Sequence, residues 1–230
     1  MSTKGKKTKK KKKLNFLKVI TAILIIYFLC YFLFNITGFK TKNLIIKGNY
    51  YLTDEEVIEQ AKLEKYPSFF LTNIFSIENK LEKNNMIKSA KVRRTLHRGY
   101  VITINEEKIL YKRRSDSNYV LSSGKESTLK SNISGVATLI NYTPKDIEKK
   151  LIKKLAKIDI DILNKISEIE YAPNKTDDER FLLYMNDGNL AYITITKTSE
   201  LNYYNKIMKK IDGKKGVLNL DSGRYFQVME

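Results

Sequence analysis

Apolar and polar positions divide the chain into one long apolar run followed by a series of short periodic segments. The run from Val19 to Phe39 contains no charged residue, and Lys18 and Lys40 flank it. Because a helix rises about 1.5 Å per residue, a helical run of this length spans roughly 31 Å, the thickness of a bilayer's hydrocarbon core. A helix also satisfies its own backbone hydrogen bonds in lipid. The pattern therefore predicts a transmembrane helix over 19–39.

The flanking charges indicate the orientation of this helix. Residues 1–18 carry nine lysines and no acidic residue. Basic residues beside a membrane segment remain in the cytoplasm, so we expect residues 1–18 inside the cell and residues 40–230 outside. A cleaved signal peptide also begins with a basic stretch. The apolar run is longer than a signal core, however, and no small-x-small cleavage pattern follows it, which favours an uncleaved anchor.

A β-α-α-β-β order is predicted for the segment that follows the run. A short alternating strand around Leu44 and Ile46 precedes Thr53, which begins a helix in a capping box with Glu56. Ser76 is the expected N-cap of a second helix. Two further alternating strands complete the order, at 87–96 and 100–106. A three-stranded sheet with both helices on one face is the economical packing of these elements.

The remaining residues, 109–230, are richer in β patterning and contain two helical segments. Thr143 is the expected cap of one helix, with Pro144 at its first position, and Ser199 is the expected cap of the other. The clearest hairpin consists of two strands that flank the turn Asn186-Asp187-Gly188. Further strands are predicted in ILYKRR, SNYVLSS, GVATLIN, ISEIEYAPN, GVLNL and RYFQV.

Several stretches of the sequence resemble one known family. They are IKGNYYLTDEEV, the Asn-x-Phe-x-Ile of Asn73 to Ile77, and IKSAKVRRTLHRGYVITINEEK, of which Ile87 to Val92 and the final Glu107-Lys108 pair are the most specific. Together with the order of elements, they resemble the POTRA domain of the FtsQ/DivIB family of bacterial cell-division proteins. The later half resembles the β-domain that follows POTRA in that family.

The resemblance implies an α+β architecture in four parts. A basic cytoplasmic tail (1–18) precedes the transmembrane helix (19–39). A POTRA-type βααββ domain (40–108) follows it, and a mixed β-sheet domain with two helices (109–230) completes the chain.

Composition and charge weigh against catalytic and nucleic-acid functions. The formal net charge is +18. Without the nine lysines of the tail, 34 basic and 25 acidic residues remain, so half of the positive charge belongs to the segment that orients the membrane helix. No nucleic-acid motif accompanies the tail, and we expect no nucleic-acid partner. The lone histidine, His97, lies in a predicted turn, and the lone cysteine, Cys30, lies in the membrane run. An ordinary zinc site therefore lacks ligands.

The other candidate chemical motifs are better explained as loops. Asp177-Asp178-Glu179 is more typical of a solvated loop than of a cation site, and Asp221-Ser222-Gly223 is more typical of a turn than of a nucleophile elbow. The sequence contains no glycine-rich phosphate loop. We therefore expect no enzyme activity, no cofactor, no metal site and no small-molecule substrate.

The terminal run is the candidate binding site. As the last strand it can lie at a sheet edge, where unpaired backbone groups accept a partner strand, or it can be the last core strand. The residues alone favour neither interpretation. The resemblance implies binding, with FtsB/DivIC- and FtsL-like division proteins as partners at the septum. The alternative is a POTRA-bearing chaperone or transport component of the cell envelope. The candidate partner-binding residues are Arg224, Tyr225, Phe226, Gln227, Val228 and Met229.

Overall fold

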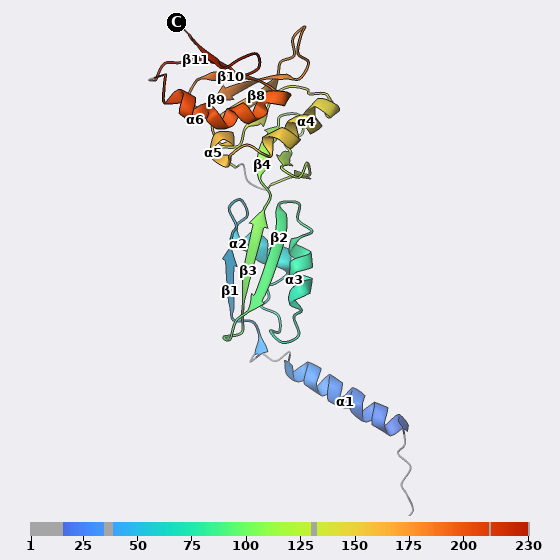
Figure 1. The fold of residues 1–230 in the computed structure, drawn as a ribbon. Coiled ribbons are helices and arrows are strands. Elements are labelled where there is room, and N and C mark those ends of the chain that lie inside the picture. The colour runs from blue at the N-terminus through green and yellow to red at the C-terminus, as the bar shows by residue number, and fades with distance from the viewer. Residues whose placement is uncertain (1–15, 35–38, 130–132, 212, 230) are drawn as a thin grey trace, which may run out of the picture.

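The computed structural model describes residues 16–34, 39–129, 133–211 and 213–229. Three parts follow one another in space (Figure 1). Helix α1 (Phe16–Phe34) comes first. It is followed by a three-stranded unit, residues 39–106, and then by a nine-stranded unit, residues 109–229. The described C-terminal end lies at the far end of the nine-stranded unit from α1 (Figure 1).

Helix α1 is long and apolar enough to cross a membrane, judged by length and composition, over Phe16–Leu33. The predicted membrane span of 19–39 overlaps this helix and differs from it at the N-terminal end. The helix begins at Phe16 and includes Lys18, because a lysine stem can lie along an apolar surface with its ammonium group in water. Phe39 lies beyond α1 and packs edge-on against Phe70, with ring centroids 5.7 Å apart. Residues 35–38 of the predicted span lie outside the described residues.

The three-stranded unit has the predicted β-α-α-β-β order. Its sheet order is β1-β3-β2, with β1 parallel and β2 antiparallel to the central β3. Its elements are β1 (Asn43–Lys47), α2 (Asp54–Ala61), α3 (Ile74–Leu81), β2 (Ile87–Arg94) and β3 (Gly99–Glu106). The side chains of Tyr100, Ile102 and Ile104 alternate along β3 and are buried in one cluster with residues of both helices. Both helices therefore cover the same face of the sheet, as predicted.

Local capping explains where these helices begin. The predicted capping box is confirmed: Glu56 N donates to Thr53 Oγ1 at 3.2 Å, and Thr53 N donates to Glu56 Oε2 at 3.0 Å. The prediction that Ser76 caps the second helix was wrong. Asn73 is the N-cap, and its Oδ1 accepts a hydrogen bond from Phe75 N at 2.9 Å. The earlier start brings Ile74 into contact with the hydrophobic core.

The nine-stranded unit is a mixed sheet of order β12-β11-β10-β9-β8-β7-β4-β5-β6. Strand β7 is parallel to both of its neighbours, β4 and β8, and β10 is parallel to β11; the other pairs are antiparallel. Its strands are β4 (Ile109–Arg113), β5 (Tyr119–Leu121), β6 (Glu126–Ser127), β7 (Thr138–Leu139), β8 (Ile166–Tyr171), β9 (Arg180–Met185), β10 (Leu190–Thr194), β11 (Gly216–Asn219) and β12 (Tyr225–Val228).

The helices of this unit begin at different residues from those predicted. Thr143 does not cap a helix: Pro144 occupies the N-cap position, so Thr143 lies one residue too early and its buried Oγ1 has no hydrogen-bond partner. The prediction that Ser199 caps a helix was wrong, because Ser199 lies inside a 3-10 helix that begins directly after β10. The Thr198 hydroxyl donates to the carbonyl oxygens of Thr194 and Ile195 in the first turn of this helix. The helical elements described here are α4 (Lys145–Leu155), α5 (Ile160–Leu163), η2 (Ile195–Tyr203) and α6 (Tyr204–Met208).

The two units share a hydrophobic core at their junction. Ile109 of β4 and Tyr119 and Leu121 of β5 are buried in the cluster that fills the three-stranded unit. Lys108, in the connection, donates to the carbonyl oxygens of Ala156 at 3.1 Å and Ile158 at 2.8 Å, just beyond α4. The boundary predicted at 108/109 thus separates two sheets with a core each, and side chains from beyond the boundary also fill part of the core of the three-stranded unit.

Leu121→Ala tests this shared core. Leu121 is fully buried, so truncating it leaves a cavity and should lower the free energy of unfolding by about 2–5 kcal/mol. Because the cavity opens in a core common to both units, hydrogen exchange should accelerate in β3 as well as in β5. Leu96→Ala is the matched control, since Leu96 is 99% exposed. Faster exchange confined to the nine-stranded unit would contradict a common core.

Candidate functional site

The predicted terminal strand lies at an edge of the nine-stranded sheet. Tyr225 to Val228 form β12, which pairs antiparallel with β11 on one side only. Arg224 immediately precedes the strand and Met229 follows it. The strand is therefore at a sheet edge, the position that partner binding by strand addition requires.

The strand register shows which backbone groups face outward. Met229 N donates to Lys215 O at 3.0 Å, which marks that pair as hydrogen-bonded. Opposed residues of an antiparallel ladder alternate between bonded and non-bonded pairs. Phe226 and Val228, paired with Leu218 and Gly216, are then the non-bonded positions. The peptide groups of Phe226 and Val228 therefore point to the open edge, where another strand can pair with them.

The side chains of this strand are largely exposed. Tyr225 is 53% exposed, Val228 50% and Met229 43%. Gln227 is also exposed, whereas Phe226 is half-buried and packs against the core of the nine-stranded unit. The terminal run thus presents the side chains of Tyr225, Val228 and Met229 to solvent and packs against the sheet through Phe226.

Arg224 is held in place by two residues that sequence reasoning missed. Its guanidinium forms an ion pair with Glu200 and lies over the ring of Tyr203, with the Arg224 Cζ 4.9 Å from the ring centroid. The hydrogen bond from Arg224 holds the pKa of the Glu200 carboxyl below its usual value. Both partners belong to η2, more than twenty residues earlier, so no local sequence signal links them to Arg224.

The turn before β12 is fixed from β9. Arg180 Nε donates to Asp221 Oδ2 at 2.7 Å, and the Arg180 guanidinium lies 3.5 Å from the Tyr192 ring centroid. Burial opposes ionisation of Asp221, but the hydrogen bonds from Arg180 and Ser222 outweigh it and keep the carboxyl pKa below its usual value. The entry to the terminal strand is therefore anchored by a partly buried ion pair.

Gly216 brings β12 unusually close to β11. A Cβ atom at Gly216 would lie 2.1 Å from Gln227 O and 2.8 Å from the tip of the Phe226 ring. The nearest obstacle is backbone, so a side chain at position 216 can be accommodated only if β12 moves.

Other sheet edges are less available than β12. On β2, the N–H of Ala90 donates to Glu82 Oε1 at 3.0 Å and the N–H of Val92 donates to Glu78 Oε1 at 2.8 Å, so carboxylates from α3 and its end occupy that edge. Strand β6 is only two residues long. Strand β1, at the remaining edge, ends in Lys47, and edge lysines discourage strand addition.

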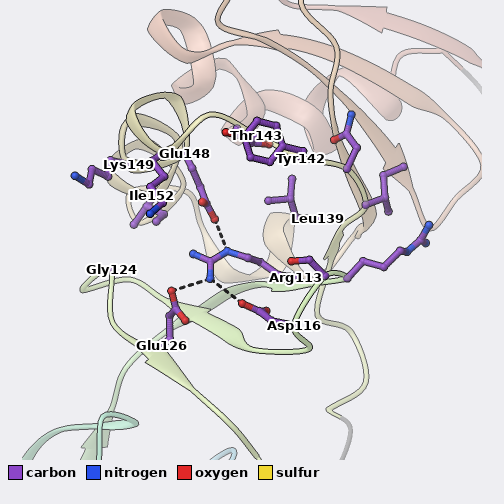
Figure 2. Close-up of a pocket in the computed structure, with 15 residues that line it drawn as sticks. Arg113, Asp116, Gly124, Glu126, Leu139, Tyr142, Thr143, Glu148, Lys149 and Ile152 are labelled. Carbon is purple, nitrogen blue, oxygen red and sulfur yellow. Dashed lines mark hydrogen bonds and ion pairs between the residues drawn. The ribbon is translucent and has the colours of Figure 1, made fainter.

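A cavity of about 560 Å³ beside α4 contains a cluster of charged residues centred on Arg113 (Figure 2). Arg113 reaches into it and is bound by three carboxylates: Nε donates to Glu148 at 2.7 Å, and Nη1 donates to Glu126 at 2.7 Å and to Asp116 at 3.4 Å. Glu148 also accepts from the Tyr111 hydroxyl at 2.8 Å. Because protein carboxylates already surround this guanidinium, the cluster is better suited to hold β4, β6 and α4 together than to bind an anionic ligand.

The remaining chemical candidates lie in loops. His97 is exposed in the turn between β2 and β3. Asp177 accepts a hydrogen bond from Glu179 N in its own loop, and the Glu179 carboxylate forms an ion pair with Lys150. Within the described residues, no group of three or more His, Cys, Asp or Glu side chains is placed to hold a metal ion.

Comparison with known proteins identifies the three-stranded unit. Residues 39–107 match the family profile described as "POTRA domain, FtsQ-type". This range covers β1 to β3 together with the chain that leads into β1.

The similarity to known proteins extends over nearly the whole chain. Cell division protein DivIB of Listeria monocytogenes is 29% identical over 229 residues, covering 96% of this chain and 85% of that protein. Cell division protein DivIB of Bacillus anthracis is 29% identical over 231 residues, covering 96% and 86%. A solved structure of the major extracytoplasmic domain of DivIB from Geobacillus stearothermophilus matches 47% of this chain and 96% of that domain, at 24% identity and a TM-score of 0.40.

Gly216→Ala should detach the terminal strand. The added Cβ would meet Gln227 O, so β12 must separate from β11, and backbone amide protection at Tyr225 and Gln227 should fall by at least about tenfold, equivalent to about 1.4 kcal/mol of local stability. Gly223→Ala is the matched control, because a Cβ there meets only the Tyr225 ring at 3.4 Å. Hydrogen exchange measured by mass spectrometry or NMR distinguishes them; equal protection in both variants would contradict the close approach.

Proposed function

Because the chain belongs to the FtsQ/DivIB family of cell-division proteins, we propose that it is a non-enzymatic scaffold of the division complex. In this role it is anchored in the cytoplasmic membrane by α1 and binds FtsB/DivIC- and FtsL-like proteins through β12. Binding assembles or stabilises the complex at the septum. The open edge of β12 is the observation that carries the proposal.

The chemistry of β12 is suited to strand addition. The outward peptide groups of Phe226 and Val228 supply backbone hydrogen bonds to an added strand, and the exposed Tyr225 and Met229 supply side-chain contacts. Tyrosine is among the residue types that most often dominate binding energy at interfaces. The ion pairs at Arg224 and Asp221 hold the strand in position before a partner arrives, which reduces the entropy lost on binding.

The anchor contributes to the same function. The nine lysines of residues 1–18 favour an N-terminus inside the cell by the positive-inside rule, and the proposal accordingly has the two folded units outside. The partners are single-span membrane proteins, so attachment to the same membrane raises their effective concentration near β12.

Val228→Pro tests strand addition in the full-length protein. Proline at Val228 removes an outward N–H but no bond to β11, as tolerated in edge strands. The loss of one inter-strand bond and the added ring should weaken binding of a DivIC-like protein on the order of tenfold. Val228→Ala, which keeps the N–H, is the matched control. Affinity is measured with both proteins co-reconstituted in nanodiscs.

A chain that ends at Gly223 gives the stronger version of this experiment. It lacks β12 altogether and should not retain a DivIC-like protein in co-purification from membranes. Undiminished capture by the truncated chain, or equal affinities of the proline and alanine variants, would exclude β12 as the binding strand.

Localisation separates this proposal from a chaperone or transport role. A fluorescent fusion at the N-terminus should form a band at midcell in dividing cells. A uniform signal around the cell envelope would instead favour the transport interpretation.

A further inference from the structure

Three segments meet at the end of the three-stranded unit that is closest along the chain to α1 (Figure 1). They are residues 39–42, 64–75 and 94–98, and we refer to them together as the tip. Backbone hydrogen bonds join them: Thr41 N donates to Pro67 O at 3.0 Å, Phe69 N to Phe39 O at 2.9 Å, and Lys42 N to Arg98 O at 2.8 Å. These hydrogen bonds hold the three segments together as one surface.

The tip carries six exposed large apolar side chains. Leu96 is 99% exposed in the turn between β2 and β3. Phe75 at the start of α3 is 67% exposed. The other exposed members are Phe39, Tyr66, Phe70 and Leu71. Grouped exposed apolar side chains of this kind mark a surface that contacts a protein or a membrane.

The aromatic side chains at the tip are held by defined contacts. Phe70 lies edge-on to both Phe39 and Phe69, with ring centroids 5.7 and 5.3 Å apart. The Arg94 guanidinium lies over the Phe69 ring at 5.3 Å and donates from Nη2 to Thr72 O at 2.8 Å. Tyr100 OH donates to Phe69 O at 2.9 Å from the core. The exposed rings are thus fixed in position by the fold.

The charge of the tip has one predominant sign. Among its residues Glu64 is the only acidic one. The basic residues are Lys40, Lys42, Lys65, Arg94 and Arg98. Aromatic side chains mixed with lysine and arginine are the composition found where proteins meet lipid headgroups, because the rings enter the interface while the cations pair with phosphates.

Chain length keeps the tip close to the membrane. Phe34 is the last residue of α1 and Phe39 the first of the tip, which leaves five Cα-to-Cα steps between them. At about 3.6 Å per step the separation cannot exceed roughly 18 Å. The headgroup region of one leaflet is itself about 5–8 Å thick. The tip is therefore held within reach of the leaflet into which α1 emerges.

We propose that the tip docks into the bilayer interface beside the C-terminal end of α1, with Leu96 and Phe70 inserted among the lipids and the basic residues paired with anionic headgroups. The proposal rests on the membrane anchoring in the proposed function. Docking gives the three-stranded unit a second attachment to the membrane and fixes its tilt. The shared core at the junction transmits that tilt to the nine-stranded unit, so that β12 is presented at a defined height above the membrane.

The experiment uses tryptophan as a depth probe, because the natural chain contains none. Leu96→Trp is made in the full-length protein and reconstituted in vesicles of phosphatidylcholine and phosphatidylglycerol. Since Leu96 is 99% exposed, the substitution leaves the fold unchanged. If the tip docks, lipids brominated near the glycerol end of the acyl chain should reduce the tryptophan emission by about half, because the indole then lies in the interface. The emission maximum should shift to shorter wavelength.

Two control variants make each outcome interpretable. Tyr50→Trp is matched, because Tyr50 is 77% exposed and lies at the opposite end of the same unit, where its N–H donates to Glu106; it should remain unquenched. Phe28→Trp reports on α1 itself and should be quenched by lipids brominated near the bilayer centre. If Phe28→Trp is unquenched, the anchoring proposal fails. If it is quenched while Leu96→Trp behaves like Tyr50→Trp, docking alone is overturned and the tip faces water or a protein.

Charge gives an independent readout of the same docking. In vesicles of phosphatidylcholine alone, quenching of Leu96→Trp should be at least about twofold weaker than in vesicles with phosphatidylglycerol, because the lysines and arginines lose their anionic partners. Adding Lys40→Glu and Lys42→Glu to Leu96→Trp should abolish this difference; both residues are exposed. Equal quenching at all lipid compositions would overturn the electrostatic part of the proposal.

Discussion

The structure depends on the hydrophobic junction between its two sheets. Tyr119 and Leu121 cross from the nine-stranded unit into the core of the three-stranded unit, and Lys108 ties the connection to the chain just beyond α4. Side chains in such a core cannot slide without opening cavities. This contact joins the two units, whose far ends are the tip near α1 and the terminal strand (Figure 1). A connection by a flexible linker would leave those ends independent.

The terminal strand shows how a protein keeps one sheet edge open while protecting others. On β2, Glu78 and Glu82 accept the hydrogen bonds that an added strand would need. On β12 the outward peptide groups are left to solvent, and the strand is fixed from behind by Phe226 and by the ion pair of Arg180 with Asp221. An exposed edge is an aggregation hazard unless it is short or has a partner, and β12 is four residues long. Selective protection of this kind is what a scaffold with one preferred binding edge requires.

The membrane imposes a direction on this arrangement. In the proposed arrangement, the open edge of β12 lies away from the lipid, because α1 and the described C-terminal end are at opposite ends of the structure (Figure 1). In the cavity beside α4, the Arg113 guanidinium is already surrounded by Glu148, Glu126 and Asp116. Charge in this part of the molecule stabilises the fold that presents β12.

The sequence by itself determined the elements whose signals are local: the apolar run, the Thr53–Glu56 capping box, the hairpin around Gly188 and the alternation along β3. Its motifs also carry the family resemblance, and its last apolar run predicted the terminal strand. Only the tertiary structure decided the order of the sheet, in which β7 inserts between β4 and β8. It alone decided the choice of Asn73 over Ser76 as a cap, the pairing of Arg224 with Glu200, and the assembly of the tip. These four features depend on contacts between residues far apart in the chain or on which face of an element is buried. The spacing of neighbouring residues encodes neither the contacts nor the choice of face.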